Sequence, residues 1–152
     1  FNIPHDAVAP HGYTFTSRSN GSKCTYLTDA GFVTDTIREA VAGSSALVLE
    51  ANHDVEMLKN GPYPRHLKQR ILSTLGHLSN DTAGHFLTEL ERLPEHIVLA
   101  PLSEHNNLPQ LAQDTVQNIL HDNNRLQETE LFVAAQNRVV ADSPLPAVLD
   151  LK

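Results

Sequence analysis

The sequence predicts an α/β fold in which a mixed sheet is flanked by helices. Two apolar runs of strand length, 46–50 and 97–100, alternate with segments of helical spacing, which is typical of layered α/β proteins. Asn20-Gly21 separates two further segments of strand character, 12–17 and 23–28, and is a strong hairpin signal. The predicted order is strand, strand, helix, strand, helix, helix, strand, helix, strand, without a repeat or an interdomain linker.

Caps and proline place the first two helices. Thr34 is a plausible N-cap for a short helix that stops at Gly43. Pro64 suits the first turn of the next helix. That helix is predicted to turn Leu67, Ile71 and Leu72 inward and to leave Lys68 and Arg70 outside or toward a site.

Apolar spacing places the last two helices. Ser79 or Asn80 caps a segment whose apolar positions follow the i, i+3, i+4, i+7 pattern of an amphipathic helix. These positions are Ala83, Phe86, Leu87 and Leu90. A final helix is predicted from Leu108 to Leu120, and a strand at 131–135 follows it.

Composition narrows the class of protein. A chain of 152 residues with 40% apolar residues is long enough for one domain with a sizeable core. The net charge of −7 argues against nucleic-acid binding by a broad basic surface. Binding of a polyanion would need local positive charge, from metal ions or from a small basic cluster. That cluster consists of Lys59, Arg65, Lys68 and Arg70.

The cellular setting is predicted from cysteine and from hydropathy. A single cysteine, Cys24, excludes an internal disulfide and fits a reducing compartment. No apolar stretch approaches the roughly 18 residues of a membrane span, and no signal peptide opens the sequence. We therefore expect a soluble cytoplasmic protein that does not bind a membrane.

Three short polar segments, called polar islands below, contain the candidate functional residues, because each segment follows an apolar run or opens a helix. Asp29, next to Gly31, is either a metal ligand or the cap of a turn. His53 and Asp54 are either a ligand or acid/base pair or a helix cap beside an exposed histidine. His77 precedes a helix N-terminus, where a phosphate or an oxyanion would be favoured.

The remaining histidines are weaker candidates, although nine in 152 residues is a high number. His5 and His11 surround a proline-containing segment without a metal-binding spacing. The others are expected to be solvated, with His105 the least certain. Nothing in the sequence resembles a nucleophilic Cys-His pair or a glycine-rich phosphate loop.

The succession of motifs resembles the C-terminal half of the metallo-β-lactamase-fold hydrolases, nearest to their WalJ/YycJ-type branch. The matching motifs cover nearly all of the chain. They are Asn52-His53-Asp54, Met57-Leu58, Gly61-Pro62-Tyr63-Pro64, Leu67-Lys68-Gln69-Arg70-Ile71, Gly76-His77-Leu78-Ser79-Asn80 and Leu102-Ser103-Glu104-His105-Asn106-Asn107.

The resemblance implies half of a four-layer αββα hydrolase with a dinuclear site, usually zinc or manganese. His5 looks like the family's third-motif histidine, a ligand of one metal, and Asp29 looks like the carboxylate that bridges both. His77 is similar to the family's non-ligand histidine near the scissile phosphate, a candidate acid. His53 matches a branch motif and is kept as a second catalytic candidate.

Two departures from the family matter. The HxHxDH motif, which supplies most ligands to both metals, is absent from these residues, and the sequence opens as if in mid-sheet. We therefore interpret 1–152 as the C-terminal part of one domain. The family's last ligand is a histidine, but Ala100-Pro101-Leu102-Ser103 has a proline there, which offers no side-chain ligand unless His105 moves in. The metal site is thus incomplete, and the chain alone is expected to be inactive.

The leading hypothesis is a phosphodiesterase or DNA exonuclease with two divalent metal ions. Lys68, Arg70, Ser79 and Asn80 are its candidate substrate contacts. One alternative is a noncatalytic binding or structural module with a decayed metal site, which Pro101 supports. Another is a small-molecule hydrolase of thioester or lactam type. The expected partners are the absent N-terminal half, nucleic acid or another phosphodiester, and a second copy of the chain.

Overall fold

The computed structural model describes residues 1–134 of the chain. Its strands are β1 (Tyr13–Thr16), β2 (Lys23–Leu27), β3 (Ala46–Leu49), β4 (His96–Leu99) and β5 (Glu130–Val133). Its helices are α1 (Asp35–Val41), α2 (Val55–Asn60), α3 (Arg65–Ile71), α4 (Asn80–Glu89) and α5 (Pro109–Asp122), with a 3₁₀ turn, η1 (Leu126–Glu128). The predicted α/β class is confirmed.

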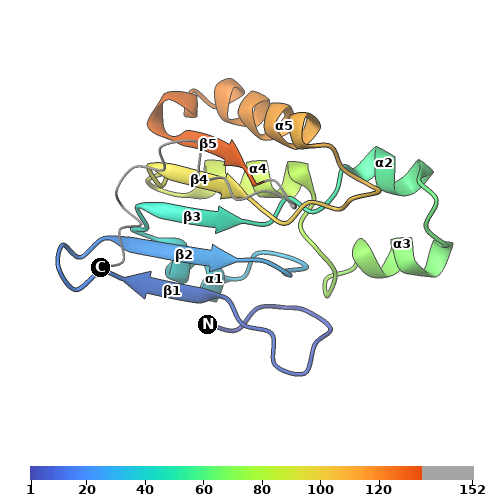
Figure 1. The fold of residues 1–152 in the computed structure, drawn as a ribbon, viewed down its shortest axis with the longest axis horizontal. Coiled ribbons are helices and arrows are strands. Elements are labelled where there is room, and N and C mark those ends of the chain that lie inside the picture. The colour runs from blue at the N-terminus through green and yellow to red at the C-terminus, as the bar shows by residue number, and fades with distance from the viewer. Residues whose placement is uncertain (135–152) are drawn as a thin grey trace.

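The strands form one mixed sheet in the order β1-β2-β3-β4-β5. The hairpin strands β1 and β2 are antiparallel, whereas β2 to β5 run parallel to one another. The carboxyl ends of the parallel strands therefore meet at one edge, and α2 and α3 lie beyond that edge (Figure 1). The polar islands after β2 and β3 are brought to this edge.

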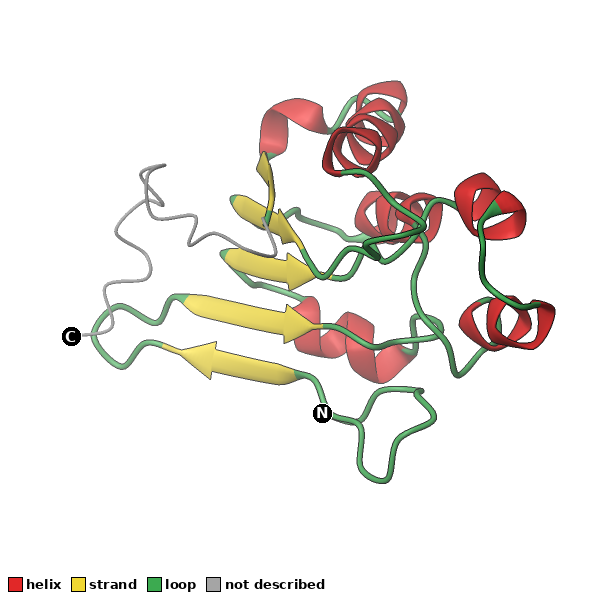
Figure 2. Ribbon diagram, turned by 45° about the vertical axis from the view of Figure 1, so that its right-hand side comes forward, coloured by secondary structure: helices red, strands yellow, loops and turns green. Residues whose placement is uncertain are grey.

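One face of the sheet holds the hydrophobic core. Alternate residues of each parallel strand are buried, among them Leu27, Leu49 and Leu99. They pack in one cluster with apolar side chains from three helices. Figure 2 shows the ribbons of the helices beside the strands. The helical residues are Ile37 and Val41 of α1, Ala83, Phe86 and Leu87 of α4, and Ala112, Val116 and Leu120 of α5. This period-2 burial is what fixes the register of the strands.

The other face of the sheet carries an apolar row that crosses every strand. Each member of the row is paired in register with the next, so all five side chains point to the same side. The row consists of Tyr13, Tyr26, Val48, Val98 and Phe132. Tyr13 and Tyr26 remain 57% and 42% exposed. Helices α1, α4 and α5 therefore pack on one face of the sheet, and the opposite face carries this apolar row.

The structure corrects several sequence predictions. Helix α2, which is missing from the predicted order of elements, follows Asp54, whose side chain caps it. Helix α3 has no fully buried residue, and Leu72 is 47% exposed, because α3 lies beyond the sheet edge. The last strand ends at Val133, and Ala135 of the predicted strand lies outside the described residues. Within residues 1–134, no helix is long and apolar enough to span a membrane.

Candidate metal and acid–base site

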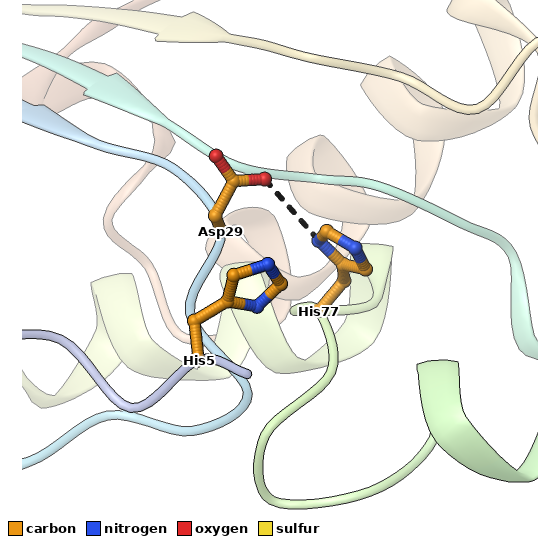
Figure 3. A group of neighbouring side chains, drawn as sticks. All are labelled: His5, Asp29 and His77. Atoms are coloured by element: carbon orange, nitrogen blue, oxygen red, sulfur yellow. Dashed lines mark ion pairs between the residues drawn. The ribbon is translucent and has the colours of Figure 1, made fainter. Parts of the chain in front are cut away.

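Three side chains from distant segments meet beside the carboxyl ends of β2 and β3. His5, Asp29 and His77 each offer a ligand atom, and these atoms all lie within 4.8 Å of one another (Figure 3). Nδ1 of His77 lies 3.6 Å from Oδ1 of Asp29. Two imidazoles and a carboxylate are ligand types that zinc and manganese accept. The cluster thus has the donors for one divalent ion.

Close backbone contacts hold the loops that carry these residues. A Cβ atom on Gly31 would lie 2.2 Å from the carbonyl oxygen of Thr74. A Cβ atom on Gly76 would lie 2.0 Å from the carbonyl oxygen of Ile71. Only glycine allows both approaches: the first sets the loop of Asp29 against the segment that leads to His77, and the second packs that segment against the end of α3.

The orientation of the His5 ring suits a ligand. Its Nδ1 lies 3.1 Å from the carbonyl oxygen of Gly76, so Nδ1–H donates and Nε2 is left as the basic nitrogen. A ligand histidine commonly binds a carbonyl in this way. The Gly31 amide donates to the carbonyl oxygen of Pro4 at 2.8 Å and ties this segment to the Asp29 loop. His5 is therefore held in place before any metal binds.

Glu50 is a candidate site residue that sequence reasoning missed. It is fully buried at the end of β3, and its Oε1 lies 2.7 Å from Nδ1 of His77. Its Oε2 accepts hydrogen bonds from the backbone amides of Ala30 and Leu78, each at 3.1 Å. The signal was present in the sequence, because a carboxylate directly after an apolar strand requires partners when it is buried.

The carboxylate of Glu50 changes the acidity of His77. The hydrogen bond to Glu50 raises the pKa of His77 above its ordinary value, against the opposing effect of burial, and the nearby Asp29 adds to the increase. Because Nδ1 faces Glu50, Nε2 is the nitrogen that can meet a ligand. Glu50 thus favours the protonated form of His77, which can present a proton at Nε2.

His53 lies inside the protein. It is 1% exposed, and no described residue forms a hydrogen bond with either ring nitrogen. Burial, and secondarily the neighbouring His77, lower the pKa of His53 to about 4. The alternative prediction was a helix cap beside an exposed histidine. The cap is confirmed, since Asp54 accepts a hydrogen bond from the Met57 amide at 2.7 Å, but the prediction that His53 is exposed is wrong.

Lys68 and Arg70 lie on the surface of α3 with partners of their own. Nζ of Lys68 donates to the carbonyl oxygen of Lys59 at 2.6 Å. The guanidinium of Arg70 pairs with Asp6, one residue after His5. Arg70 is therefore held next to the His5 segment, whereas Lys68 is tied to the end of α2, and a polyanion would compete with both contacts.

The side chains of Ser79 and Asn80 form hydrogen bonds within the protein. The hydroxyl of Ser79 caps α4 by accepting from the Thr82 amide at 3.1 Å. Asn80 is fully buried, and its amide exchanges hydrogen bonds of 3.0 and 2.8 Å with Asn107. The position of Asn80 gives no support to the prediction that it contacts substrate, because its side chain is satisfied in the interior.

The segment after β4 supplies no ligand to the cluster. Pro101 follows the strand without a donor atom on its side chain. His105 lies against the ring of Tyr63, with the two ring centroids 5.7 Å apart. Among the described residues, the cluster thus comprises His5, Asp29 and His77.

Comparison with known proteins places this geometry in context. The chain is 40% identical over 123 residues to exodeoxyribonuclease YycJ of Bacillus anthracis, an alignment that covers 80% of this chain and 46% of the relative. It is also 40% identical over 145 residues to exodeoxyribonuclease WalJ of Streptococcus pneumoniae, covering 95% of this chain and 51% of the relative. The chain spans about half the length of these curated relatives.

Other comparisons add little. No protein-family model matches the chain. A crystal structure of Zn²⁺-bound PqqB from Methylobacterium extorquens is similar at 17% identity and a TM-score of 0.47, over 88% of this chain and 46% of that one. A likeness this distant supports no inference about function. The expected resemblance to WalJ/YycJ-type proteins is confirmed by the two exodeoxyribonucleases.

Proposed function

We propose, from its 40% identity to two WalJ/YycJ-type exodeoxyribonucleases over most of its length, that this chain carries half of the site of a metal-dependent nuclease. The observation that supports the proposal most is the meeting of His5, Asp29 and His77, with Glu50 buried behind His77. Metal donors and a supported proton donor within one cluster are what phosphodiester hydrolysis requires.

His5 and Asp29 are the proposed metal ligands, and His77 is the proposed acid. When bound, a divalent cation lowers the pKa of water and neutralises phosphate charge. His77 keeps its proton because Glu50 stabilises the imidazolium, and it donates that proton from Nε2 to the leaving oxygen. Asp29, 3.6 Å from His77, helps to orient the imidazole. His53, which is buried and neutral, is retained only as support for the loop before α2.

Lys68 and Arg70 are proposed to contact the DNA backbone near the site. A phosphate would take over the hydrogen bonds that Lys68 gives to Lys59 and that Arg70 gives to Asp6. Freed Asp6 would remain beside His5, where Nε2 lies 3.6 Å from Oδ1. Because the sequence has a net charge of −7, binding must depend on this local cation pair and on bound metal.

The remaining ligands are proposed to come from sequence outside these 152 residues. Two or three protein ligands are at or below the number usual for catalytic zinc, so a second ion needs further donors. The apolar row on the face of the sheet opposite α1, α4 and α5 supports the four-layer arrangement, in which a second sheet packs on this face. A single half-buried thiol, Cys24, supports a reducing compartment such as the cytoplasm.

A second candidate function is a noncatalytic module whose metal site has decayed. Pro101 favours it, because the family pattern has a ligand histidine at that position. The substitution Pro101→His tests this reading directly. In a decayed module it would leave metal binding absent, whereas in a working site an added imidazole would tighten the binding of one ion by about tenfold or more.

The proposed function is tested by metal content and hydrolysis in the full-length protein. The variants are His5→Ala, Asp29→Ala and His77→Ala, with His121→Ala as a control, because His121 is exposed at the end of α5. Zinc and manganese are measured by mass spectrometry after dialysis. Hydrolysis is measured on end-labelled DNA, a simple phosphodiester and a thioester panel.

We expect His5→Ala and Asp29→Ala to lose metal and hydrolysis, and His121→Ala to keep both. We expect His77→Ala to keep metal and to lose about 10²–10⁴-fold in rate, as for removal of a general acid. Loss of metal in His77→Ala would instead make His77 a third ligand. A wild-type protein that binds no metal would overturn the nuclease, and a preference for thioesters would favour the small-molecule hydrolase.

A further inference from the structure

A pocket opens beside the candidate site on the side of α3. It has a volume of about 430 Å³ and is walled partly by His77, which also belongs to the metal cluster. This volume is within the range of about 300–1,000 Å³ that is usual for small-molecule sites. The other lining residues are Asn52, Tyr63, Leu67, Ile71, Leu102, Ser103, Glu104 and His105.

Away from His77, the lining of the pocket suits an uncharged ring better than a phosphate. Among residues 1–134, its lining contains the carboxylate of Glu104 and no lysine or arginine. Leu67, Ile71 and Leu102 give it apolar walls. The rings of Tyr63 and His105 both line the pocket, with their centroids 5.7 Å apart and their planes tilted by 44°, so they form an aromatic corner rather than a parallel stack.

Backbone hydrogen bonds and a close contact hold the segments that line the pocket. The Ser103 amide donates to the carbonyl oxygen of Asn52 at 2.7 Å, and the Asp54 amide donates to that of Asn106 at 2.9 Å. A Cβ atom on Gly61 would lie 2.5 Å from Oδ1 of Asn106. The segment that carries Tyr63 thus starts in close contact with the loop that carries His105, which favours a preformed site.

We propose that this pocket receives the terminal nucleoside of the DNA strand that the site hydrolyses. The base would stack on Tyr63 and His105, and the scissile phosphate would lie at His77, which is shared by pocket and cluster. The Glu104 carboxylate can accept, and the Ser103 hydroxyl can donate, hydrogen bonds at the edges of the base or sugar. This inference rests on the proposed nuclease function, and it assigns Tyr63 and His105 as specificity residues.

The inference is tested by binding of uncharged nucleosides, which needs no hydrolysis. Thymidine, deoxyadenosine and deoxyribose 5-phosphate are titrated into the metal-free full-length protein and followed by calorimetry and ligand-observed NMR. The variants are Tyr63→Ala, the conservative Tyr63→Phe, His105→Ala, and the control His121→Ala. Thermal unfolding of each variant identifies any that fails to fold.

We expect both nucleosides to bind and the sugar phosphate not to bind. Tyr63→Ala should weaken nucleoside binding by about five- to a hundredfold, the range for loss of base stacking on an aromatic ring, whereas Tyr63→Phe should keep it. Absence of nucleoside binding, or equal binding by folded Tyr63→Ala and wild type, would overturn the inference.

A second arm separates this inference from the nuclease proposal. Digestion of DNA with an ordinary terminal nucleotide is compared with digestion of DNA whose terminal residue is abasic. Hydrolysis that ignores the missing base would overturn the pocket and leave the nuclease intact. Nucleoside binding that depends on Tyr63, in a protein that hydrolyses neither DNA, would support the pocket and overturn the nuclease.

Discussion

At the scale of single residues, Glu50 decides the chemical state of the site. Its carboxylate is fully buried and is shared by one imidazole and two backbone amides. A buried carboxylate is costly unless its charge is compensated. The hydrogen bond to His77 provides that compensation, and it raises the pKa of His77 in return.

Replacing Glu50 with glutamine should therefore lower the pKa of His77. The neutral amide cannot stabilise the imidazolium, so the pKa of His77 should fall toward or below its ordinary value. We also expect a loss of about 1–3 kcal/mol in the free energy of unfolding, because a hydrogen bond to a charged group is replaced. NMR titration of the metal-free protein and urea unfolding provide the two measurements. Glu56→Gln, at an exposed carboxylate, is the control, and an unchanged His77 pKa in Glu50→Gln would contradict the assignment.

His53 should make the protein sensitive to mild acid. Its pKa is about 4 in the folded protein, below the ordinary value near 6.5, so the unfolded chain binds more protons between these values. The free energy of unfolding should be fully retained above pH 6.5 and should decrease as the pH falls toward 4, by on the order of 3 kcal/mol.

The substitution His53→Leu isolates this effect. Leucine has no proton to gain, and no described residue loses a hydrogen bond from the ring nitrogens. The slope of unfolding free energy against pH should therefore flatten in this variant between pH 6.5 and 4. Urea unfolding at several pH values measures it, and parallel curves for variant and wild type would rule out His53 as the source.

At the scale of elements, helix caps place the loops of the site. At the start of α1, α2 and α4, a side-chain oxygen accepts a hydrogen bond from a backbone amide of the first turn. These oxygens belong to Thr34, Asp54 and Ser79, respectively. Two of these helices begin directly after the polar islands at the sheet edge. The caps thus end the loops that carry His53 and His77 and restrict how those loops can move.

Removing the cap at Asp54 should destabilise α2. Asp54→Ala leaves the Met57 amide without its partner at 2.7 Å, and we expect a loss of about 1 kcal/mol in unfolding free energy. Asp35→Ala is the matched control, because the Asp35 side chain is fully exposed in the first turn of α1. Chemical denaturation measures both, and an equal, small effect of the two substitutions would contradict a capping role for Asp54.

At the scale of the whole molecule, the two faces of the sheet differ in their cover. One face is packed with helices, and the other carries the row of Tyr13, Tyr26, Val48, Val98 and Phe132. An apolar face of this kind is a feature of a sheet that packs on another layer. The chain spans about half of its relatives, which is consistent with such a layer.

A charge in the middle of this row should be costly in the full-length protein. If a second layer covers the face, Tyr26→Lys places an unpaired charge in an apolar interface and should cost about 2–3 kcal/mol in unfolding free energy. Thr36→Lys, on the exposed side of α1, is the control. A change within about 0.5 kcal/mol for Tyr26→Lys, as for ordinary surface positions, would show that the face is open.

The fold was largely readable from local patterns. Apolar runs, the Asn20-Gly21 hairpin and the cap at Thr34 predicted strands and helices that the structure contains, because these signals act within a few residues. Helix α2 was missed because it is short and only Leu58 is buried. Leu72 was wrongly predicted to be buried, because apolar spacing identifies the apolar face of a helix but does not show whether another element packs against that face.

The sequence by itself determined the α/β class, the islands at the strand ends and the residue types able to bind metal, because each depends on local propensity and on hydrophobic period. Only the tertiary structure decided which of nine histidines meet one aspartate, that Glu50 supports His77, and that Asn80 and His53 are buried. These outcomes depend on contacts between residues 20 to 70 positions apart, such as the approach of Gly31 to Thr74, and spacing along the chain does not encode them.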